Sequence, residues 1–340
     1  MKTETVAVIG DRLGRSQAAA TARAVQLLRE GEVVALPTET VYGLAADALD
    51  PTAVAKIFEA KERPRFDPLI LHLPGNDWLE RVARIDTDSR ALTKELSTEF
   101  WPGPLTLVLD RQSIVPEIVT AGLDTVAVRM SSHPVFTEVI SAFGKPLAAP
   151  SANRFGRVSP TIAQHVFDEL NGRVPLIIDA GPTAYGIEST IIAVRGNRIE
   201  ILRLGPITPE QLAPFGHIHV DRAPEKVSAP GQLPSHYAPK TSLRLINNAE
   251  SLALPASYRV GLLAWNPLIR GEHFAVVRTL SKRQDLREAA SNLFRCLREL
   301  DDCGLDLIVA ERVPAQGIGS AILDRLERAS HDSEIRGTHE

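Results

Sequence analysis

Residues 33–73 decide the fold: they open with Val33-Val-Ala-Leu36, continue with Pro-Thr-Glu-Thr-Val-Tyr-Gly-Leu44, and close with Leu69-Ile-Leu-His-Leu73. The pattern predicts a strand, a polar turn, a helix and a second strand. Asp50 and Pro51 suit the N-cap and first turn of that helix, which we expect to end near Lys61 and Arg63. Hydroxyl groups of the turn and two cations at the helix end are then expected to converge. Basic residues are also common at solvated helix ends, so this stretch alone leaves both readings open.

The whole chain has the composition of a globular protein with more than one domain. Its 340 residues exceed the size at which single cores stop growing. Apolar residues make up 44% and charged residues 24%, which is ordinary for a folded chain. The net charge of −4 argues against polyanion binding by the molecule as a whole, although a local basic cavity remains compatible with it.

Targeting signals and cysteines indicate a compartment. The first ten residues lack the long apolar core of a secretory signal, and no apolar run is long enough to span a membrane. The two cysteines, Cys296 and Cys303, lie seven residues apart in a helical pattern, which favours free thiols over a metal pair. We therefore expect a cytoplasmic protein that does not bind membranes.

The first 220 residues mix strands and helices without a regular βαβ alternation. Strands are predicted at 6–9, 105–109, 125–129, 176–179, 188–194 and 199–204, and helices at 18–29, 86–100, 134–143 and 161–171. This order predicts an α/β domain with a mixed twisted sheet and helices, rather than a doubly wound sheet.

A linker separates this domain, residues 1–220, from a smaller one. Residues 221–241 hold four prolines and one glycine and show no periodicity. Residues 242–330 are predicted to form a small parallel-sheet, Rossmann-like α/β domain. Its strands are expected at 243–246, 260–264, 275–278 and 307–310, and its helices at 282–302 and 318–330. The polar residues 331–340 are predicted to be a disordered tail.

Several common motifs are missing from the sequence. It contains no G-x-x-x-x-G-K-[ST] loop, no G-x-G-x-x-G after a strand, no H-E-x-x-H and no G-x-S-x-G. Gly317-Ile-Gly319 opens a predicted helix but lacks the third glycine of a dinucleotide site, which favours a simple helix N-terminus.

The positive signal is a set of polar residues within apolar elements. Lys61, Arg63, Arg129 and Arg203 lie in or at the ends of such elements, where a cation is usually paired or directed at an anion. Hydroxyl groups follow strand ends or interrupt a strand at Thr38, Thr40, Ser151, Ser189 and Thr190. Each hydroxyl taken singly is typical of a turn or cap. Together these residues predict a cavity for a multiply charged anion, with phosphate as the prime candidate, in a nucleotide-using domain.

Many separated stretches resemble one family. They include Leu36-Pro-Thr-Glu-Thr-Val-Tyr-Gly-Leu44, Ile57-Phe-Glu-Ala-Lys-Glu-Arg-Pro64, Phe100-Trp-Pro-Gly-Pro-Leu-Thr106, Ala149-Pro-Ser-Ala-Asn153 and His236-Tyr-Ala-Pro-Lys240. With these stretches the chain resembles the Sua5/YrdC family of threonylcarbamoyl-AMP synthases, of the two-domain Sua5 type. The resemblance implies a YrdC-like sheet around a basic cavity. It also implies a reaction of L-threonine, bicarbonate and ATP, with Mg²⁺ on the triphosphate, that gives threonylcarbamoyl-AMP and pyrophosphate. A downstream transferase machinery would use this product to make N6-threonylcarbamoyladenosine in tRNA.

The resemblance also implies roles for individual residues. The catalytic quartet falls on Lys61, Arg63, Ser151 and Asn153. The threonine pocket falls on Thr38, His72, Arg129 and Ser189, with Arg129 suited to grip a carboxylate. The ATP contacts fall on Arg63, Asp67, Thr125, Ala149, Ser151, Ser159 and Arg203, and on His236 and Tyr237 as a lid. No residue is assigned to a metal. Without the resemblance, His72 would be read as a half-buried strand histidine and Tyr237 as an interdomain packing residue.

Two positions depart from the family pattern. Asp67 stands where the family has asparagine, and because a carboxylate facing phosphates would repel them, we expect Asp67 to point outward or to bind Mg²⁺. Leu204 replaces a proline and loosens the turn after Arg203 without removing the cation.

Two other functions remain as alternatives. An RNA-binding YrdC-like module without synthase activity is one, and weak RNA binding is also open, although the net charge does not favour it. A carbamoyl-transfer enzyme of the hydrogenase-maturation kind is the other. That kind carries paired C-x-x-C zinc motifs, which two cysteines cannot supply.

Overall fold

The computed structural model describes residues 2–8, 15–220, 229–231, 237–249, 257–267 and 273–336, with the side chains of all but residues 15 and 331–336. These residues divide into two compact units. The first is drawn from Met1–Phe155, Pro160–Ala184 and Glu188–Gln232, and the second from Gly156–Ser159, Tyr185–Ile187 and Leu233–Glu340. Two loops from the first 220 residues thus belong to the second unit. The sequence-based domain limits follow the chain and stay a prediction.

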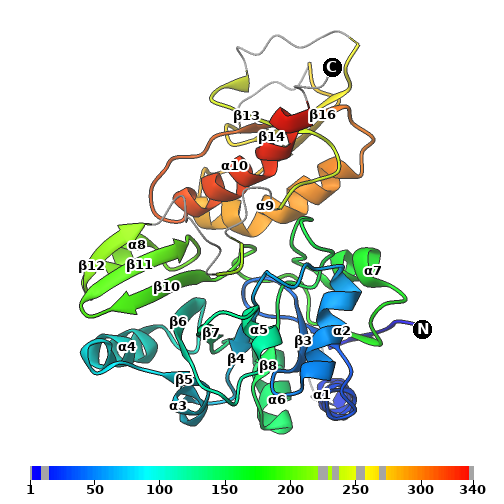
Figure 1. Cartoon of the computed structure of the whole chain (residues 1–340). Helices are drawn as coiled ribbons and strands as arrows, with labels where there is room; N and C mark the ends of the chain where they lie inside the picture. Colours follow the sequence, from blue (N-terminus) through cyan, green and yellow to red (C-terminus); the bar gives the residue numbers. More distant parts are fainter. Residues whose placement is uncertain are drawn as a thin grey trace. The chain divides into compact units, whose positions relative to one another are not determined.

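The first unit is built on a mixed sheet (Figure 1). Its strands are β1 (Glu4–Ala7), β2 (Val34–Leu36), β3 (Gly43–Asp47), β4 (Ile70–His72), β5 (Ala83–Arg84), β6 (Leu105–Arg111), β7 (Thr125–Arg129), β8 (Leu147–Ala148), β9 (Leu176–Asp179), β10 (Thr190–Arg195), β11 (Arg198–Arg203) and β12 (His217–Val220). Across the sheet they follow the order β1-β9-β2-β3-β8-β4-β7-β6-β10-β11-β12, with β5 beside β6. Because β7 pairs parallel with β4 and antiparallel with β6, the prediction of a mixed sheet is confirmed.

Helices pack on both faces of this sheet. They are α1 (Arg15–Arg29), α2 (Pro51–Lys61), α3 (Leu79–Val82), α4 (Thr87–Phe100), α5 (Glu117–Thr120), α6 (Pro134–Phe143), α7 (Ala163–Leu170) and α8 (Pro209–Leu212), with a 3₁₀ turn at Asn76–Trp78. Alternation along β2 separates two cores: Val34 and Leu36 pack with α1 and α6, whereas Ala35 packs with α2 and α7. Helices α1 and α6 lie side by side and cover only one half of their face of the sheet (Figure 1).

The other half of the α1/α6 face carries a short apolar strip. Its members are Ile70, Val108, Ala127, Ile191, Ala193, Leu202 and Ala229. All but Ala229 come from the strands β4, β6, β7, β10 and β11. Side chains alternate along a strand, so His72, Thr106 and Arg129 emerge on this same face, each two residues from a member of the strip. Polar residues from several strands therefore meet above the strip.

The opening stretch differs from its prediction by one strand. Asp50 caps α2 as expected, because its side chain accepts the Thr52 backbone N–H at 2.8 Å, and the helix ends at Lys61. Between the turn and α2, however, the chain forms β3, which pairs antiparallel with β2. This strand was missed because Gly43 and the alanines after Leu44 have little strand propensity. It lies buried in the sheet, where tertiary packing overrides propensity.

The second unit is a small parallel sheet with two helices. Its strands are β13 (Leu243–Ile246), β14 (Val260–Ala264), β15 (Val276–Thr279) and β16 (Leu307–Glu311), and its helices are α9 (Leu286–Asp301) and α10 (Gly319–Arg336). The strand order is β13-β16-β14-β15, and every pair is parallel, which confirms the predicted α/β domain. The helices lie side by side (Figure 1). Helix α10 runs into the segment predicted as a disordered tail, of which residues 337–340 lie outside the described residues. Among the described helices, none combines the length and the apolar composition that crossing a membrane requires.

Two loops from earlier in the chain pack against α9. The Arg298 guanidinium donates to the backbone carbonyl of Val158. A Cβ atom on Gly186 would lie only 2.5 Å from the Cα atom of Ser291, and Gly186 has a φ of +69°. Only glycine fits there, for reasons of both space and backbone conformation.

A buried carboxylate joins the loops of the second unit. Glu311, at the end of β16, is 3% exposed. It accepts the backbone N–H groups of Ala249 at 3.2 Å, Trp265 at 3.0 Å and Asn266 at 2.9 Å. One side chain thus fixes the segments that follow β13 and β14.

Replacing Glu311 with alanine is expected to lower the free energy of unfolding of the second unit by about 3 kcal/mol, because backbone donors lose a charged acceptor. Hydrogen exchange of the β14 and β16 amides under native conditions measures this loss. The control is Glu327→Gln, which removes an exposed ion pair with Arg312 and should change stability by less than about 1 kcal/mol. Equal effects of the two substitutions would refute this role of Glu311.

Candidate functional site

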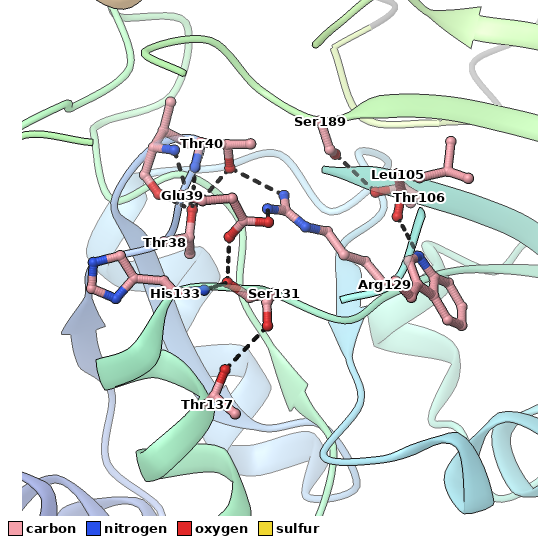
Figure 2. Close-up of polar contacts among 12 residues, drawn as sticks. Thr38, Glu39, Thr40, Leu105, Thr106, Arg129, Ser131, His133, Thr137 and Ser189 are labelled. Carbon is pink, nitrogen blue, oxygen red and sulfur yellow. Dashed lines mark hydrogen bonds and ion pairs between the residues drawn. The ribbon is translucent and has the colours of Figure 1, made fainter. Parts of the chain in front are cut away.

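Arg129, at the end of β7, is the centre of a buried polar network. It is 3% exposed. Its Nη2 atom donates to Glu39 Oε1 at 2.6 Å and its Nη1 atom to Thr40 Oγ1 at 3.1 Å. Ser131 donates to the second oxygen of Glu39 at 2.5 Å, so Glu39 lies between Arg129 and Ser131 (Figure 2). The Nε–H group of Arg129 has no hydrogen-bond partner among the described residues.

Both members of the Arg129–Glu39 pair are ionised at neutral pH. Burial opposes ionisation of Glu39, but the Arg129 charge and the hydrogen bond from Ser131 outweigh it and lower the pKa of Glu39. A guanidinium stays protonated in proteins. The pair is therefore a buried, neutral unit made of two charges.

The turn after β2 is fixed by its own hydroxyl groups. Thr38 Oγ1 lies 2.8 Å from Thr40 Oγ1 and donates to the Val41 carbonyl at 2.6 Å. It also accepts the backbone N–H groups of Thr40 and Val41. Thr38 thereby holds the turn that presents Glu39 and Thr40 to Arg129.

His72, on β4, is a neutral histidine on the same face. It is 2% exposed, and its ring centroid lies 4.6 Å from that of Phe136 on α6. Burial, reinforced by the charge of Arg129, lowers the pKa of His72 to about 3. Its Nδ1 atom has no hydrogen-bond partner among the described residues.

Ser189 and Arg203 form a second buried cluster. Ser189 Oγ lies 2.8 Å from Thr106 Oγ1 (Figure 2). Arg203 donates from Nη2 to Ser189 Oγ and from Nε to the Ser189 carbonyl, both at 3.0 Å. Its Nη1 atom donates to the Pro230 carbonyl at 3.2 Å. Leu204, the family's proline position, is half-buried against the main core, so this departure leaves Arg203 in place.

Lys61 joins the end of α2 to the loop after β8. Its Nζ atom donates to the carbonyl of Ser151 at 2.5 Å and to that of Asn153. Burial, with the nearby charge of Arg63, lowers the pKa of Lys61 well below its usual range. The structure thus brings together three members of the predicted quartet, and Lys61 there binds backbone oxygens of the other two.

Arg63, the fourth member, turns toward Asp67. Its Nη2 atom lies 2.8 Å from Asp67 Oδ2, and the guanidinium also donates to the carbonyls of Asp67 and Pro68. Asp67 is fully buried, so the expectation that it points outward is wrong. Burial raises the pKa of Asp67, and the charges of Arg63, Lys61 and Arg203 oppose that rise. A carboxylate is tolerated inside because these cations surround it.

The remaining nucleotide residues are more widely spread. Thr125 begins β7, about 13 Å along the strand from Arg129, and lines a cavity of about 560 Å³ with Val108, Ala193 and others. Ala149 is buried, and its backbone N–H donates to the Ile70 carbonyl at 3.0 Å. Ser159 and Tyr237 belong to the second unit.

The lid residues are described only in part. His236 lies outside the described residues. Tyr237 is buried in the second unit, where its ring stacks 5.6 Å from Phe294 and lies 5.0 Å from the Arg325 guanidinium. Closure of these two residues over a nucleotide stays a prediction.

Sequence reasoning missed Glu39, Ser131 and Thr106 as members of the site. Glu39 had a usable signal, because an arginine within an apolar strand needs a counter-charge and Glu39 is the acid in the decisive turn. Ser131 and Thr106 carried no local signal. In the part of the chain that the structure describes, no group of three or more His, Cys, Asp or Glu side chains is arranged to hold a metal ion.

The fold and the site define a class of protein. A mixed-sheet unit that buries cations and hydroxyls at the ends of its strands and helices, followed by a small parallel-sheet unit, is the two-domain Sua5 architecture. Residues 26–205 match the Sua5/YciO/YrdC family model, described as telomere recombination. Residues 207–331 match the C-terminal domain of threonylcarbamoyl-AMP synthase. The chain belongs to the Sua5/YrdC family of threonylcarbamoyl-AMP synthases.

Relatives in bacteria and archaea are similar over nearly their whole length. The threonylcarbamoyl-AMP synthase of Bacillus subtilis (strain 168) is 41% identical over 93% of this chain and 94% of its own. That of Pyrococcus abyssi (strain GE5 / Orsay) is 39% identical over 90% of this chain and 93% of its own. The crystal structure of P. abyssi Sua5 complexed with L-threonine superposes with a TM-score of 0.86 at 36% identity, over 96% of this chain and 98% of that one.

Replacing His72 with asparagine is expected to flatten the pH dependence of stability. Below its ordinary pKa of 6.5 the unfolded histidine binds a proton, whereas the folded one, with a pKa of about 3, does not. The wild type should therefore lose up to about 1.4 kcal/mol per pH unit as the pH falls below that value. Urea unfolding at neutral and acidic pH measures this slope, with exposed His219→Asn as the control. A slope that survives in the His72 variant would contradict the assignment.

Proposed function

We propose that the first unit joins L-threonine, bicarbonate and ATP into L-threonylcarbamoyl-AMP, with release of pyrophosphate and water. The observation that carries this proposal is the buried Arg129–Glu39 cluster, which leaves an Arg129 donor available beside the hydroxyl of Thr40. Membership of the synthase family, and the relative crystallised with L-threonine, support the same reaction.

The amino acid would bind at the Arg129 end of β7. The Nε–H group of Arg129 suits a carboxylate oxygen, because charge-assisted hydrogen bonds of this kind are strong. Thr38 and Ser189 would supply hydroxyls around the substrate side chain. Neutral His72 can donate or accept a hydrogen bond without adding charge beside the amine.

ATP would bind across the neighbouring strands. Arg63 and Arg203, with Ser151 and Asn153, would contact the phosphates, and Lys61 would hold the 151–153 loop in shape. We place the nucleoside end toward Thr125, where the apolar side chains of Val108 and Ala193 line the cavity among mainly polar and charged residues. Ala149 would line this path through its backbone. Ser159, His236 and Tyr237 remain proposed contacts.

The chemistry needs positioning more than covalent catalysis. The threonine amine attacks the bicarbonate carbon, water leaves, and a carbamate forms. A carbamate oxygen then attacks the α-phosphorus, and the P–O bond to pyrophosphate breaks. The chain's part is to align the groups and to neutralise phosphate charge, so no enzyme-bound intermediate is required.

Among the described residues, no cluster of three or more His, Cys, Asp or Glu side chains is arranged to hold Mg²⁺. Asp67 is the buried carboxylate at the phosphate end, but its pairing with Arg63 makes it a poor ligand for a second cation. Mg²⁺ usually keeps several waters and binds through substrate phosphates. We therefore assign no residue to it and route no step through it.

The product would be consumed outside this chain. A threonylcarbamoyl-AMP is a reactive mixed anhydride, which suits transfer to an amine of tRNA by a separate machinery. A cytoplasmic location belongs to the proposal, because Cys296 and Cys303 are both free thiols. RNA binding without synthesis is the alternative, and the following experiment separates the two.

Pyrophosphate release from ATP is expected to require both L-threonine and bicarbonate. A coupled pyrophosphate assay with each substrate left out in turn measures this dependence, and L-serine and L-valine serve as matched amino acids. Release that ignores threonine, or that clearly prefers another amino acid, would reject the proposal. An absence of release together with tRNA binding would favour the RNA-binding alternative.

Replacing Asp67 with asparagine is expected to tighten ATP binding by about three- to tenfold, because a buried carboxylate no longer competes with phosphate for Arg63. The gain should shrink at acidic pH, since protonation of Asp67 relieves the same competition in the wild type. Calorimetric titration with ATP at two pH values measures both effects. Asp168→Asn on the exposed face of α7 is the control. Weaker ATP binding in the Asp67 variant would contradict this account.

A further inference from the structure

We propose that Glu39 is a positioning residue that makes Arg129 select an amino-acid carboxylate and reject phosphate. The proposal rests on the proposed function, because it needs Arg129 to bind L-threonine. Glu39 does not itself touch the substrate in this account. It acts through the guanidinium that it holds.

The first step is the occupancy of the Arg129 donors. A guanidinium carries N–H groups on all three nitrogens. Nη2 is taken by Glu39 and Nη1 by Thr40, while Nε–H has no partner among the described residues (Figure 2). A buried donor without a partner is costly. Of the three nitrogens, Nε is the one whose N–H group has no partner, and the contacts with Glu39 and Thr40 therefore leave it to an acceptor that a ligand supplies.

The second step is that both carboxylate oxygens of Glu39 are already bound within the protein. Its Oε1 binds Arg129 and its Oε2 binds Ser131. Ser131 in turn accepts the His133 backbone N–H at 3.3 Å, and its carbonyl accepts the Thr137 hydroxyl at 3.1 Å. These bonds tie Glu39 to the start of α6. Both oxygens are engaged, and the lowered pKa makes Glu39 a weak base, so proton transfer is not its task.

The third step concerns charge. Arg129 alone would attract any anion, and a phosphate group more strongly than a carboxylate because it carries more charge. Because Arg129 is paired with Glu39, it offers an oriented N–H donor to a ligand, while the pair as a whole carries no net positive charge. A singly charged carboxylate can then bind by its fit to Nε–H, whereas ATP or pyrophosphate brings more negative charge close to the Glu39 carboxylate and is repelled.

Glu39→Gln tests the proposal, with Glu32→Gln as the matched control, since Glu32 forms a half-exposed ion pair with Lys56 away from the site. The expected result is a ten- to hundredfold weaker binding of L-threonine, about the loss from a charged hydrogen bond, with ATP binding changed by less than about twofold. The preference for L-threonine over L-threoninamide should shrink, and inorganic pyrophosphate should become competitive with threonine. Calorimetry and inhibition kinetics measure these quantities.

Unchanged threonine affinity, or an equal loss for threonine and ATP, would overturn the inference. If Glu39→Gln does not fold, Ser131→Ala keeps the Arg129–Glu39 pair and removes the hydrogen bond that orients it, together with the one from the His133 backbone N–H. Threonine binding should then weaken by about three- to tenfold, and no change would again overturn the inference. Direct titration of the wild type with L-threonine distinguishes a failure of the proposed function from a failure of the role given to Glu39. No binding there rejects the proposed function, whereas equal binding by wild type and variant rejects the role of Glu39 alone.

Discussion

A cation that is buried in a protein must be neutralised or given acceptors nearby, and the first unit satisfies this requirement at four places. Arg129 is neutralised by Glu39, and Arg63 by Asp67. Lys61 and Arg203 instead donate to backbone carbonyls of distant segments. Three of these solutions join chain segments that are far apart in sequence, whereas Arg63 and Asp67 are four residues apart. The charges that suit a phosphate or a carboxylate are therefore also the charges that hold the strand ends of this sheet together.

The arrangement of helices explains why the site lies where it does. Helices α1 and α6 cover one half of a sheet face with apolar side chains. On the other half, β4, β7, β6 and β10 present only a short apolar strip, which leaves that face to polar groups at the strand ends. The second half thus combines a rigid floor with hydrogen-bonding groups around it, as a small-molecule site requires.

Much of the local structure could be predicted from the sequence, because its helices and strands show regular periodicity and favourable capping residues. Strand β7 and helix α6 have the predicted bounds, and Asp50 caps α2 as expected. The strand order could not be derived this way, because β9 pairs with β1 and β2, which lie more than a hundred residues earlier in the sequence. In the site, Arg129 and Lys61 were found as cations in apolar surroundings, but their partners were not, because the acceptors are a turn carboxylate and backbone carbonyls. Asp67 was misjudged because repulsion from phosphate was weighed without the cations around it.

Gly186 and the 156–159 loop have a consequence for how the molecule is made. The second unit contains two short segments that precede most of its sequence by a hundred residues or so, and they pack on α9. Closing such long loops is slow, because chain entropy is lost before the contact forms. These two segments are synthesised before α9, so they are already present in the chain when α9 forms. A gene fragment that begins after residue 221 would therefore encode the second unit without residues 156–159 and 185–187, two segments that belong to its fold.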